Sequence, residues 1–235
     1  GLIVWNDAET GLTQAVMDAT WITAKRTGAA TAVAAKYLAR KDSEVVGILA
    51  CGVQGFSNVE ALAGLFPLKR VKAFDLIPDA AAAYADKVRR ELGLDVDVVA
   101  SPEAAVRRSD IVVAAGPLLK NPSSVIENDW FGPGAFASPV DYDSYWKGEV
   151  LRNVDKFCTD DVRQMMFTRT LGYFREIPEK VLDLGDVVAG KSPGREREEE
   201  RTMAMNLGLA LDDMAVAPLV YRRAVELGLG INLPL

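Results

Sequence analysis

The chain has 235 residues, a hydrophobic content of 49% and a net charge of −6 at pH 7, which suit a globular protein with a substantial core. An acidic chain lacks the basic face that nucleic acid or an anionic membrane requires, and no apolar run approaches the roughly 18 residues of a membrane helix. The absence of histidine excludes Ser-His-Asp hydrolysis and histidine-ligated metals within this chain. Two cysteines are too few for a disulfide framework or a zinc cluster. We therefore expect a cytoplasmic protein without a metal, whose proton transfers depend on Asp, Glu, Lys, Tyr or Cys.

The first segment, GLIVWNDAETG, predicts part of a β-hairpin with its turn at Glu9-Thr10-Gly11. Because the chain opens on Gly1, we expect further residues ahead of it. An Ala-rich helix is expected over 16–40, where apolar residues recur at helical spacing.

Short apolar runs then alternate with helical segments. Strands are expected at 44–50, 71–75, 96–100, 111–116, 134–140 and 155–159, with helices at 53–66, 78–92 and 101–110. This alternation is typical of a parallel, doubly wound α/β sheet. Beyond it, a solvated connector is expected over 190–202 and a long helix over 203–230, with a kink near Pro218.

The stretch EVVGILACGVQGFSN, residues 44–58, has the outline of a dinucleotide-binding turn, G-x-G-x-x-G. Gly52 allows the backbone to approach a pyrophosphate, and Gly55 allows the helix to pack close to the strand. Ala50 replaces the first glycine, which is tolerable if its φ is negative. The phosphates would then bind at the amino terminus of the following helix.

Asp75 lies at the end of the second expected strand, 20 residues after Gly55. A carboxylate at this position accepts hydrogen bonds from the ribose hydroxyls of NAD and repels the 2′-phosphate of NADP. The sequence therefore predicts a Rossmann domain that prefers NAD to NADP.

Several segments resemble the ornithine cyclodeaminase/mu-crystallin family. The matching stretches are MDATWITAKRTGAATAVAAKYLA, GILACGVQG, DIVVAAGP, PGAFASPVDYDSYW and GKSPGR…ERTMAMNLGLALDDMAVAPLVYRRA. The resemblance implies a homodimeric NAD(P)-dependent enzyme that acts on the α-carbon–nitrogen bond of a small amino acid or cyclic imine. It also implies a Rossmann domain over 29–205, inserted into a substrate and dimerisation domain represented by 1–28 and 206–235. Further residues of that second domain, including an arginine and a lysine for substrate, would precede Gly1.

Family roles transfer to individual positions of this chain. Arg26, from the R-T-[GA]-A motif, resembles the arginine that binds the substrate carboxylate beside the nicotinamide; a guanidinium matches a carboxylate in bidentate fashion. Leu207 and Gly208 resemble the pair that closes over substrate and nicotinamide. The resemblance places these residues at the cofactor: Arg26, Thr27, Val53, Gln54, Ala115, Gly116 and Lys147.

The family commonly has N-A-x-G-x-D after the P-G dipeptide, with the final Asp as proton donor and acceptor. Counting from Pro133-Gly134 without a gap places Asp143 on that Asp and Asp141 on a glycine. Asp143 is therefore the expected acid/base and Asp141 its rival, and repulsion between the two carboxylates would raise one pKa.

Three functions remain open. The first is a redox-neutral cyclodeaminase similar to ornithine cyclodeaminase. The second is a cyclic ketimine reductase or an alanine dehydrogenase-type oxidoreductase. The third is a non-enzymatic protein, similar to mu-crystallin, that binds NAD(P) or another ligand.

Overall fold

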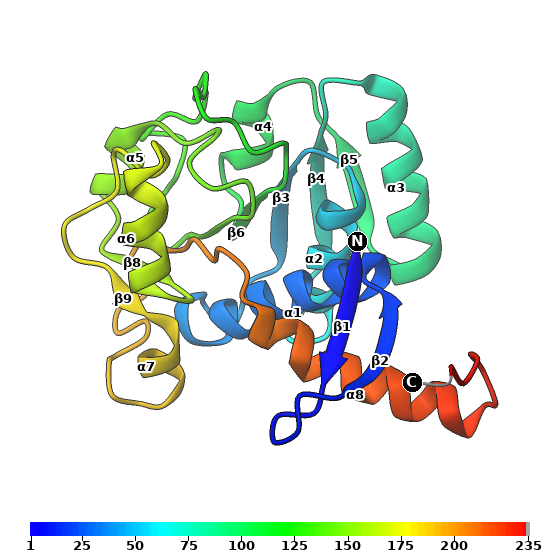
Figure 1. Cartoon of the computed structure of the whole chain (residues 1–235). Helices are drawn as coiled ribbons and strands as arrows, with labels where there is room; N and C mark the ends of the chain where they lie inside the picture. Colours follow the sequence, from blue (N-terminus) through cyan, green and yellow to red (C-terminus); the bar gives the residue numbers. More distant parts are fainter. Residues whose placement is uncertain (234–235) are drawn as a thin grey trace.

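The computed structural model describes residues 1–233 and contains one large parallel sheet (Figure 1). Its eight strands follow the order β5-β4-β3-β6-β7-β10-β8-β9, and all neighbouring strands are parallel. The strands are β3 (Val45–Leu49), β4 (Arg70–Phe74), β5 (Asp95–Val98), β6 (Ile111–Ala114), β7 (Phe136–Pro139), β8 (Lys156–Thr159), β9 (Leu182–Asp183) and β10 (Thr202–Ala204). The chain runs outward from β3 to β4 and β5 and then returns to β6, so the strand order reverses between β3 and β6. Ligands of open α/β sheets bind at such a reversal, beyond the carboxyl ends of the strands.

Helices cover both faces of this sheet, as the doubly wound prediction requires. They are α1 (Thr20–Leu38), α2 (Val53–Ala63), α3 (Pro78–Leu92), α4 (Pro102–Val106), α5 (Gly148–Arg152), α6 (Val162–Thr170), α7 (Leu184–Val188) and α8 (Ala210–Glu226). The alternation of strand side chains divides the core into two clusters. In β6, Ile111 and Val113 belong to the cluster with α1, α2 and α3, whereas Val112 and Ala114 belong to the one with α4, α5 and α6.

A hairpin of β1 (Leu2–Asn6) and β2 (Thr13–Asp18) precedes the sheet, with the expected turn between its antiparallel strands. It lies against α8, which also packs on α1 (Figure 1). Ile3, Ile22 and Ala217 form the centre of this small core. The helix expected from residue 16 begins only at Thr20, because the chain up to Asp18 completes β2 and the Asp18 carboxylate accepts the Thr20 N–H.

The carboxyl-terminal third departs from the expected pattern. The helix predicted over 203–230 begins at Ala210, because residues 202–204 form β10 between β7 and β8. This strand has three residues, all buried, and no polar alternation that would mark it in the sequence. Pro218 lies inside α8, which continues beyond it to Glu226.

The expected solvated connector over 190–202 is partly buried. Arg195 donates hydrogen bonds to the backbone oxygens of Leu38 and Glu200, at 2.8 and 2.7 Å, and to the Thr202 hydroxyl at 3.0 Å. Five N–H donors in a rigid fork allow one arginine to join these segments. The connector therefore fastens the end of α1 to β10.

The division into units 1–28, 29–205 and 206–235 stays a proposal. The first proposed boundary falls within α1, and the last two residues of the third unit lie outside the described residues.

Ala50 adopts a left-handed backbone conformation with φ of +73°, so the condition under which alanine was expected to be tolerable here, a negative φ, is not met. The chain must turn sharply between β3 and α2, and the Ala50 N–H still donates to the Phe74 backbone oxygen at 2.9 Å. A Cβ in this region of φ/ψ space is strained by roughly 1–2 kcal/mol. The first position of the glycine motif thus has the backbone conformation that glycine favours, although the residue there is alanine.

Replacing Ala50 with glycine should raise the free energy of unfolding by about 1 kcal/mol, because glycine adopts this φ without strain. The same change should leave the affinity for NAD within roughly tenfold, about 1.4 kcal/mol. Denaturant unfolding measures the first effect and fluorescence titration the second. Ala83→Gly, on an exposed position of α3, should instead lower stability by about 0.5–1 kcal/mol. Destabilisation by both changes would contradict a left-handed Ala50.

Candidate active site

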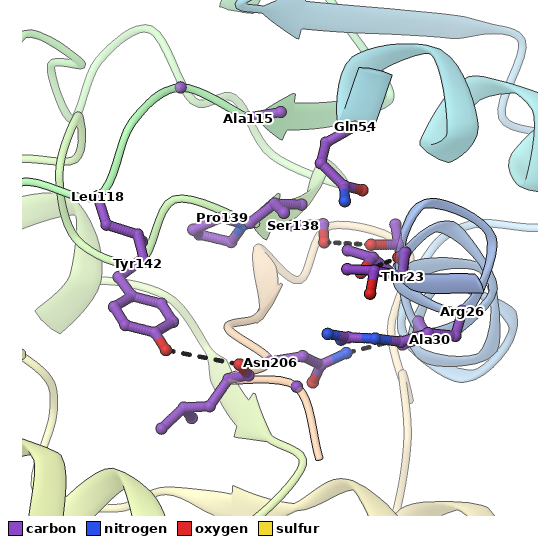
Figure 2. Close-up of a pocket in the computed structure, with 16 residues that line it drawn as sticks. Thr23, Arg26, Ala30, Gln54, Ala115, Leu118, Ser138, Pro139, Tyr142 and Asn206 are labelled. Carbon is purple, nitrogen blue, oxygen red and sulfur yellow. Dashed lines mark hydrogen bonds between the residues drawn. The ribbon is translucent and has the colours of Figure 1, made fainter. Parts of the chain in front are cut away.

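A cavity of about 220 Å³ lies beyond the carboxyl ends of β3, β6 and β7 (Figure 2). Its walls come from α1, the start of α2, and the loops after β6, β7 and β10. The lining residues are Thr23, Arg26, Thr27, Ala30, Thr31, Gln54, Ala115, Gly116, Leu118, Ser138, Pro139, Val140, Tyr142, Asn206, Leu207 and Gly208. Seven of the positions predicted from the sequence therefore meet at one cavity: Arg26, Thr27, Gln54, Ala115, Gly116, Leu207 and Gly208.

The amino terminus of α2 forms one wall of this cavity. Gly52 is the N-cap, and a Cβ added there would meet nothing within 4 Å, so a ligand can approach the backbone closely. A Cβ on Gly55 would lie 2.7 Å from the Ala50 backbone oxygen, and Gly55 O also accepts the Tyr84 hydroxyl at 3.1 Å. The first N–H groups of a helix have no intrahelical partner and favour an anion. Gly52, Val53 and Gln54 can therefore bind a phosphate group.

Asp75 follows β4 beside the same turn. Its two carboxylate oxygens accept the backbone N–H of Cys51 at 2.7 Å and that of Ile77 at 2.9 Å. Each carboxylate oxygen can accept more than one hydrogen bond, so the carboxylate can also accept ribose hydroxyls. The backbone thereby fixes Asp75 next to the phosphate-binding turn, although Asp75 does not line the cavity itself.

Among the lining residues that the structure describes, Arg26 is the one that carries a charge. Its side chain is 18% exposed, and its Nε donates to Asp213 of α8 at 3.1 Å. A Cβ added to Gly208 would lie 3.2 Å from the guanidinium carbon, and Gly208 has a φ of +84°. The positive φ favours glycine at 208, and the Arg26 guanidinium lies close to it. Thr27, beside it on α1, donates its hydroxyl proton to the Thr23 backbone oxygen at 2.7 Å.

Asp160 is a residue of the site that the sequence analysis missed. Its carboxylate accepts the backbone N–H of Leu207 at 2.9 Å and of Gly208 at 2.7 Å, and so orients the turn that packs against Arg26. The available signal was an acidic residue at the carboxyl end of an apolar strand, the same signal that identified Asp75.

Two amide oxygens at the cavity lack hydrogen-bond partners among the described residues. Gln54 Oε1 and Asn206 Oδ1 are both buried, although both side chains line the cavity. Buried polar atoms are almost always paired, so these oxygens can accept hydrogen bonds from N–H or O–H groups of a bound ligand. A carboxamide or an amine would satisfy them. Asn206 was not among the predicted site residues.

Neither of the two candidate acids is among the residues that line the cavity. Asp141 is 1% exposed, and one of its oxygens accepts the Gly116 N–H at 3.0 Å. Burial raises the pKa of Asp141 to about 8, with a smaller contribution from the charge of Asp143. Asp143 lines a separate cavity of about 280 Å³ together with Lys120 and Arg175, and burial also raises its pKa. The expected repulsion between the acids is present, but burial is the main cause of both shifts.

Lys147 also lies apart from the candidate site. Its ammonium group is paired with Glu127, and the residue is the N-cap of α5. Lys147 is therefore not among the predicted cofactor residues that line the cavity.

A parallel sheet whose order reverses beside a G-x-x-G turn, with a cavity at that point, defines a Rossmann-type α/β protein with a small-molecule site. Comparison with known proteins shows which family within this class the chain belongs to. The sequence profile of the ornithine cyclodeaminase/mu-crystallin family matches residues 1–228. The chain belongs to this family, as the sequence analysis predicted.

Three relatives show how close the similarity is. The alanine dehydrogenase of Archaeoglobus fulgidus is 34% identical over 97% of this chain and 72% of its own length. The Δ1-pyrroline-2-carboxylate reductase of Thermococcus litoralis, solved in complex with NADH and L-proline, gives a TM-score of 0.86 at 31% identity and covers 99% of this chain and 74% of its own. The structure of an archaeal alanine dehydrogenase dimer with bound NAD gives a TM-score of 0.85 at 32% identity. The match covers 99% of this chain and 73% of the dehydrogenase chain.

No helix among residues 1–233 is both long and apolar enough to cross a membrane.

Proposed function

We propose that this protein is an NAD(H)-dependent oxidoreductase that acts on the carbon–nitrogen bond of a small α-amino acid or of the corresponding imine. The observation that carries the proposal is the position of Arg26, which extends into the cavity beside the amino terminus of α2. A carboxylate bound to Arg26 would place its α-carbon within the space between α1 and the ends of β6 and β7. When bound, the nicotinamide supplies or removes the hydride at that carbon.

The residues around the turn suit NAD. Gly52, Val53 and Gln54 offer backbone N–H groups to the pyrophosphate, Asp75 accepts the ribose hydroxyls, and Ala115 and Gly116 border the nicotinamide side of the cavity. The unpaired oxygens of Gln54 and Asn206 suit ligands with N–H groups, such as a carboxamide or an amino substrate. Relatives solved with NAD or NADH support this assignment.

Replacing Asp75 with serine should reduce the preference for NAD over NADP, because the charge that repels a 2′-phosphate is lost. We expect the ratio of NADH to NADPH affinities to fall by about tenfold or more, measured by fluorescence titration of both cofactors. Asp79→Ser in the first turn of α3 is a control that removes a nearby exposed carboxylate and should leave the ratio unchanged. Equal ratios in the wild type and in Asp75→Ser would remove Asp75 from the cofactor site.

The cavity lining favours a substrate with a small apolar side chain. Among the described lining residues the only charge is the positive one of Arg26, and Leu118, Val140 and Leu207 are apolar. A diamino acid such as ornithine brings a second ammonium group, for which this lining offers no carboxylate. Net oxidation or reduction is therefore favoured over redox-neutral cyclodeamination, which stays the second candidate on the strength of the family.

A homodimer is proposed as the assembly. The outer face of the β1–β2 hairpin exposes Leu2, Val4 and Val16, at 73%, 54% and 58%. Exposed apolar residues gathered on one element are typical of an interaction surface, and one relative is described as a dimer.

The test is a substrate screen of the full-length protein. Pyruvate with ammonia, pyrroline-2-carboxylate and piperideine-2-carboxylate would be offered with NADH, and alanine, ornithine and lysine with NAD, while the absorbance of NADH is followed. Stoichiometric NADH consumption with an imine or keto acid is the expected result. Conversion of ornithine without a net change in NADH would select the cyclodeaminase instead. Tight NAD binding with no turnover of any compound would favour the non-enzymatic binding protein.

A further inference from the structure

Tyr142 lies between the two candidate acids in the sequence, and it lines the cavity whereas neither acid does. Its ring lines the cavity on the side opposite Arg26 (Figure 2). Its hydroxyl is directed at the Leu207 backbone oxygen at 3.5 Å, well beyond the usual 2.7–2.8 Å of an O–H···O bond. This proton is therefore available to a better acceptor.

The backbone explains why tyrosine, and not either aspartate, faces the cavity. Tyr142 has a φ of +61°, a conformation that a bulky side chain rarely adopts and that costs on the order of 1–3 kcal/mol. The resulting turn directs Asp141 to the Gly116 N–H and Asp143 to the other cavity. Strain of this kind persists only where the surroundings enforce it. Here the Tyr142 ring packs on Phe174 and Tyr173, with distances between ring centroids of 4.8 and 6.0 Å.

The other groups around the cavity cannot transfer a proton readily. A phenol is ordinarily a stronger acid than a guanidinium, an amide or an alcohol, and these are the other polar side-chain groups of the described lining. The pKa of Tyr142 is raised, mainly by burial and further by Asp160, while Arg26 opposes the shift. The phenol is thus protonated at neutral pH and can act as a donor.

We propose that the Tyr142 hydroxyl donates the proton to the nitrogen of the bound imine, in the role that the family pattern gives to Asp143. The inference rests on the proposed function. As the hydride supplied by NADH forms the new C–H bond, the electron pair of the C=N π bond moves to nitrogen. The nitrogen takes the phenolic proton, and the tyrosinate regains a proton from water. An imine, NADH and one proton thus give an amine and NAD⁺.

The first test measures binding and requires no turnover. Tetrahydrofuran-2-carboxylate carries a ring oxygen that accepts a hydrogen bond where the imine nitrogen would lie, and cyclopentanecarboxylate lacks that acceptor. With NADH present, the wild type should bind the first compound about fivefold more tightly, about 1 kcal/mol. In Tyr142→Phe this ratio should fall to about one. Tyr173→Phe, which removes a neighbouring hydroxyl from the same aromatic cluster, should leave it unchanged.

The second test is kinetic. With the best imine from the screen, Tyr142→Phe should lower kcat by about a hundredfold, whereas Asp143→Asn and Tyr173→Phe should stay within threefold. A large loss in Asp143→Asn with activity kept in Tyr142→Phe overturns the proposal, as does a ligand ratio that Tyr142→Phe leaves unchanged. Failure of both carboxylates to bind overturns it as well. If the ratio of the two ligand affinities depends on Tyr142 but no imine is turned over, the Tyr142 hydroxyl is supported as a hydrogen-bond donor. That result contradicts the proposed function and not the role of Tyr142 as donor.

Discussion

Replacing Arg26 with alanine should lower kcat/KM for the amino acid or imine by about a thousandfold, about 4 kcal/mol. The Arg26 side chain is 18% exposed, and its Nε donates a hydrogen bond to Asp213. Binding a carboxylate there therefore requires little reordering of the side chain. The substitution removes the only positive charge among the described lining residues and leaves the Asp213 carboxylate without its partner. Steady-state kinetics measure the loss, and the affinity for NADH should change by less than tenfold.

Two matched variants separate carboxylate binding from general damage. Arg26→Lys keeps the charge but loses the bidentate fork, so it should recover only part of the activity. Lys25→Ala removes the adjacent charge on α1, which is paired with Glu60 outside the cavity, and should leave kcat/KM within threefold. A wild-type kcat/KM in Arg26→Ala would mean that the substrate carboxylate is bound elsewhere.

The cofactor half of the site could be predicted from the sequence because its determinants are local. The apolar run of β3, the glycines at 52 and 55, the helix α2 and the Asp at the end of β4 follow one another along the chain. Parallel strands bring their carboxyl ends to one edge, so this order places Asp75 beside the turn without knowledge of any distant contact. The bounds of the six predicted strands differ from the observed ones by at most two residues at either end.

The remaining features depend on contacts between distant segments. β10 is a strand only because its three residues insert between β7 and β8. Counting along the sequence places Asp143 on the family's catalytic position, but the left-handed Tyr142 rotates the side chains that follow. Asp160 acts on Leu207 and Gly208, more than forty residues further along the chain. Periodicity and motif spacing carry no information on such contacts.

The role of Gly28 also depends on a contact between distant segments. Its replacement is the change for which we expect the largest effect on stability. Within the R-T-G-A-A-T segment, Gly28 is buried where α1 crosses α2. A Cβ added there would lie 2.7 Å from the Ser57 carbonyl carbon and 3.2 Å from the Asn58 nitrogen. Both are backbone atoms of α2 and cannot rotate away. The close approach of the two helices also brings Thr27 and Gln54 to the same cavity.

Gly28→Ala should lower the free energy of unfolding by about 2–3 kcal/mol, with a fall in Tm of roughly 5–10 °C. Helix propensity alone predicts the opposite sign, because alanine is favoured over glycine inside a helix by about 1 kcal/mol. Gly132→Ala provides the matched control, since its added Cβ meets nothing within 4 Å and its φ is not positive. That change should leave stability equal or raise it by about 0.4–1 kcal/mol. Denaturant unfolding of both variants decides between packing and propensity. A stabilised Gly28→Ala would mean that α1 and α2 lie further apart than the structure places them, and that Arg26 and Gln54 do not share one cavity.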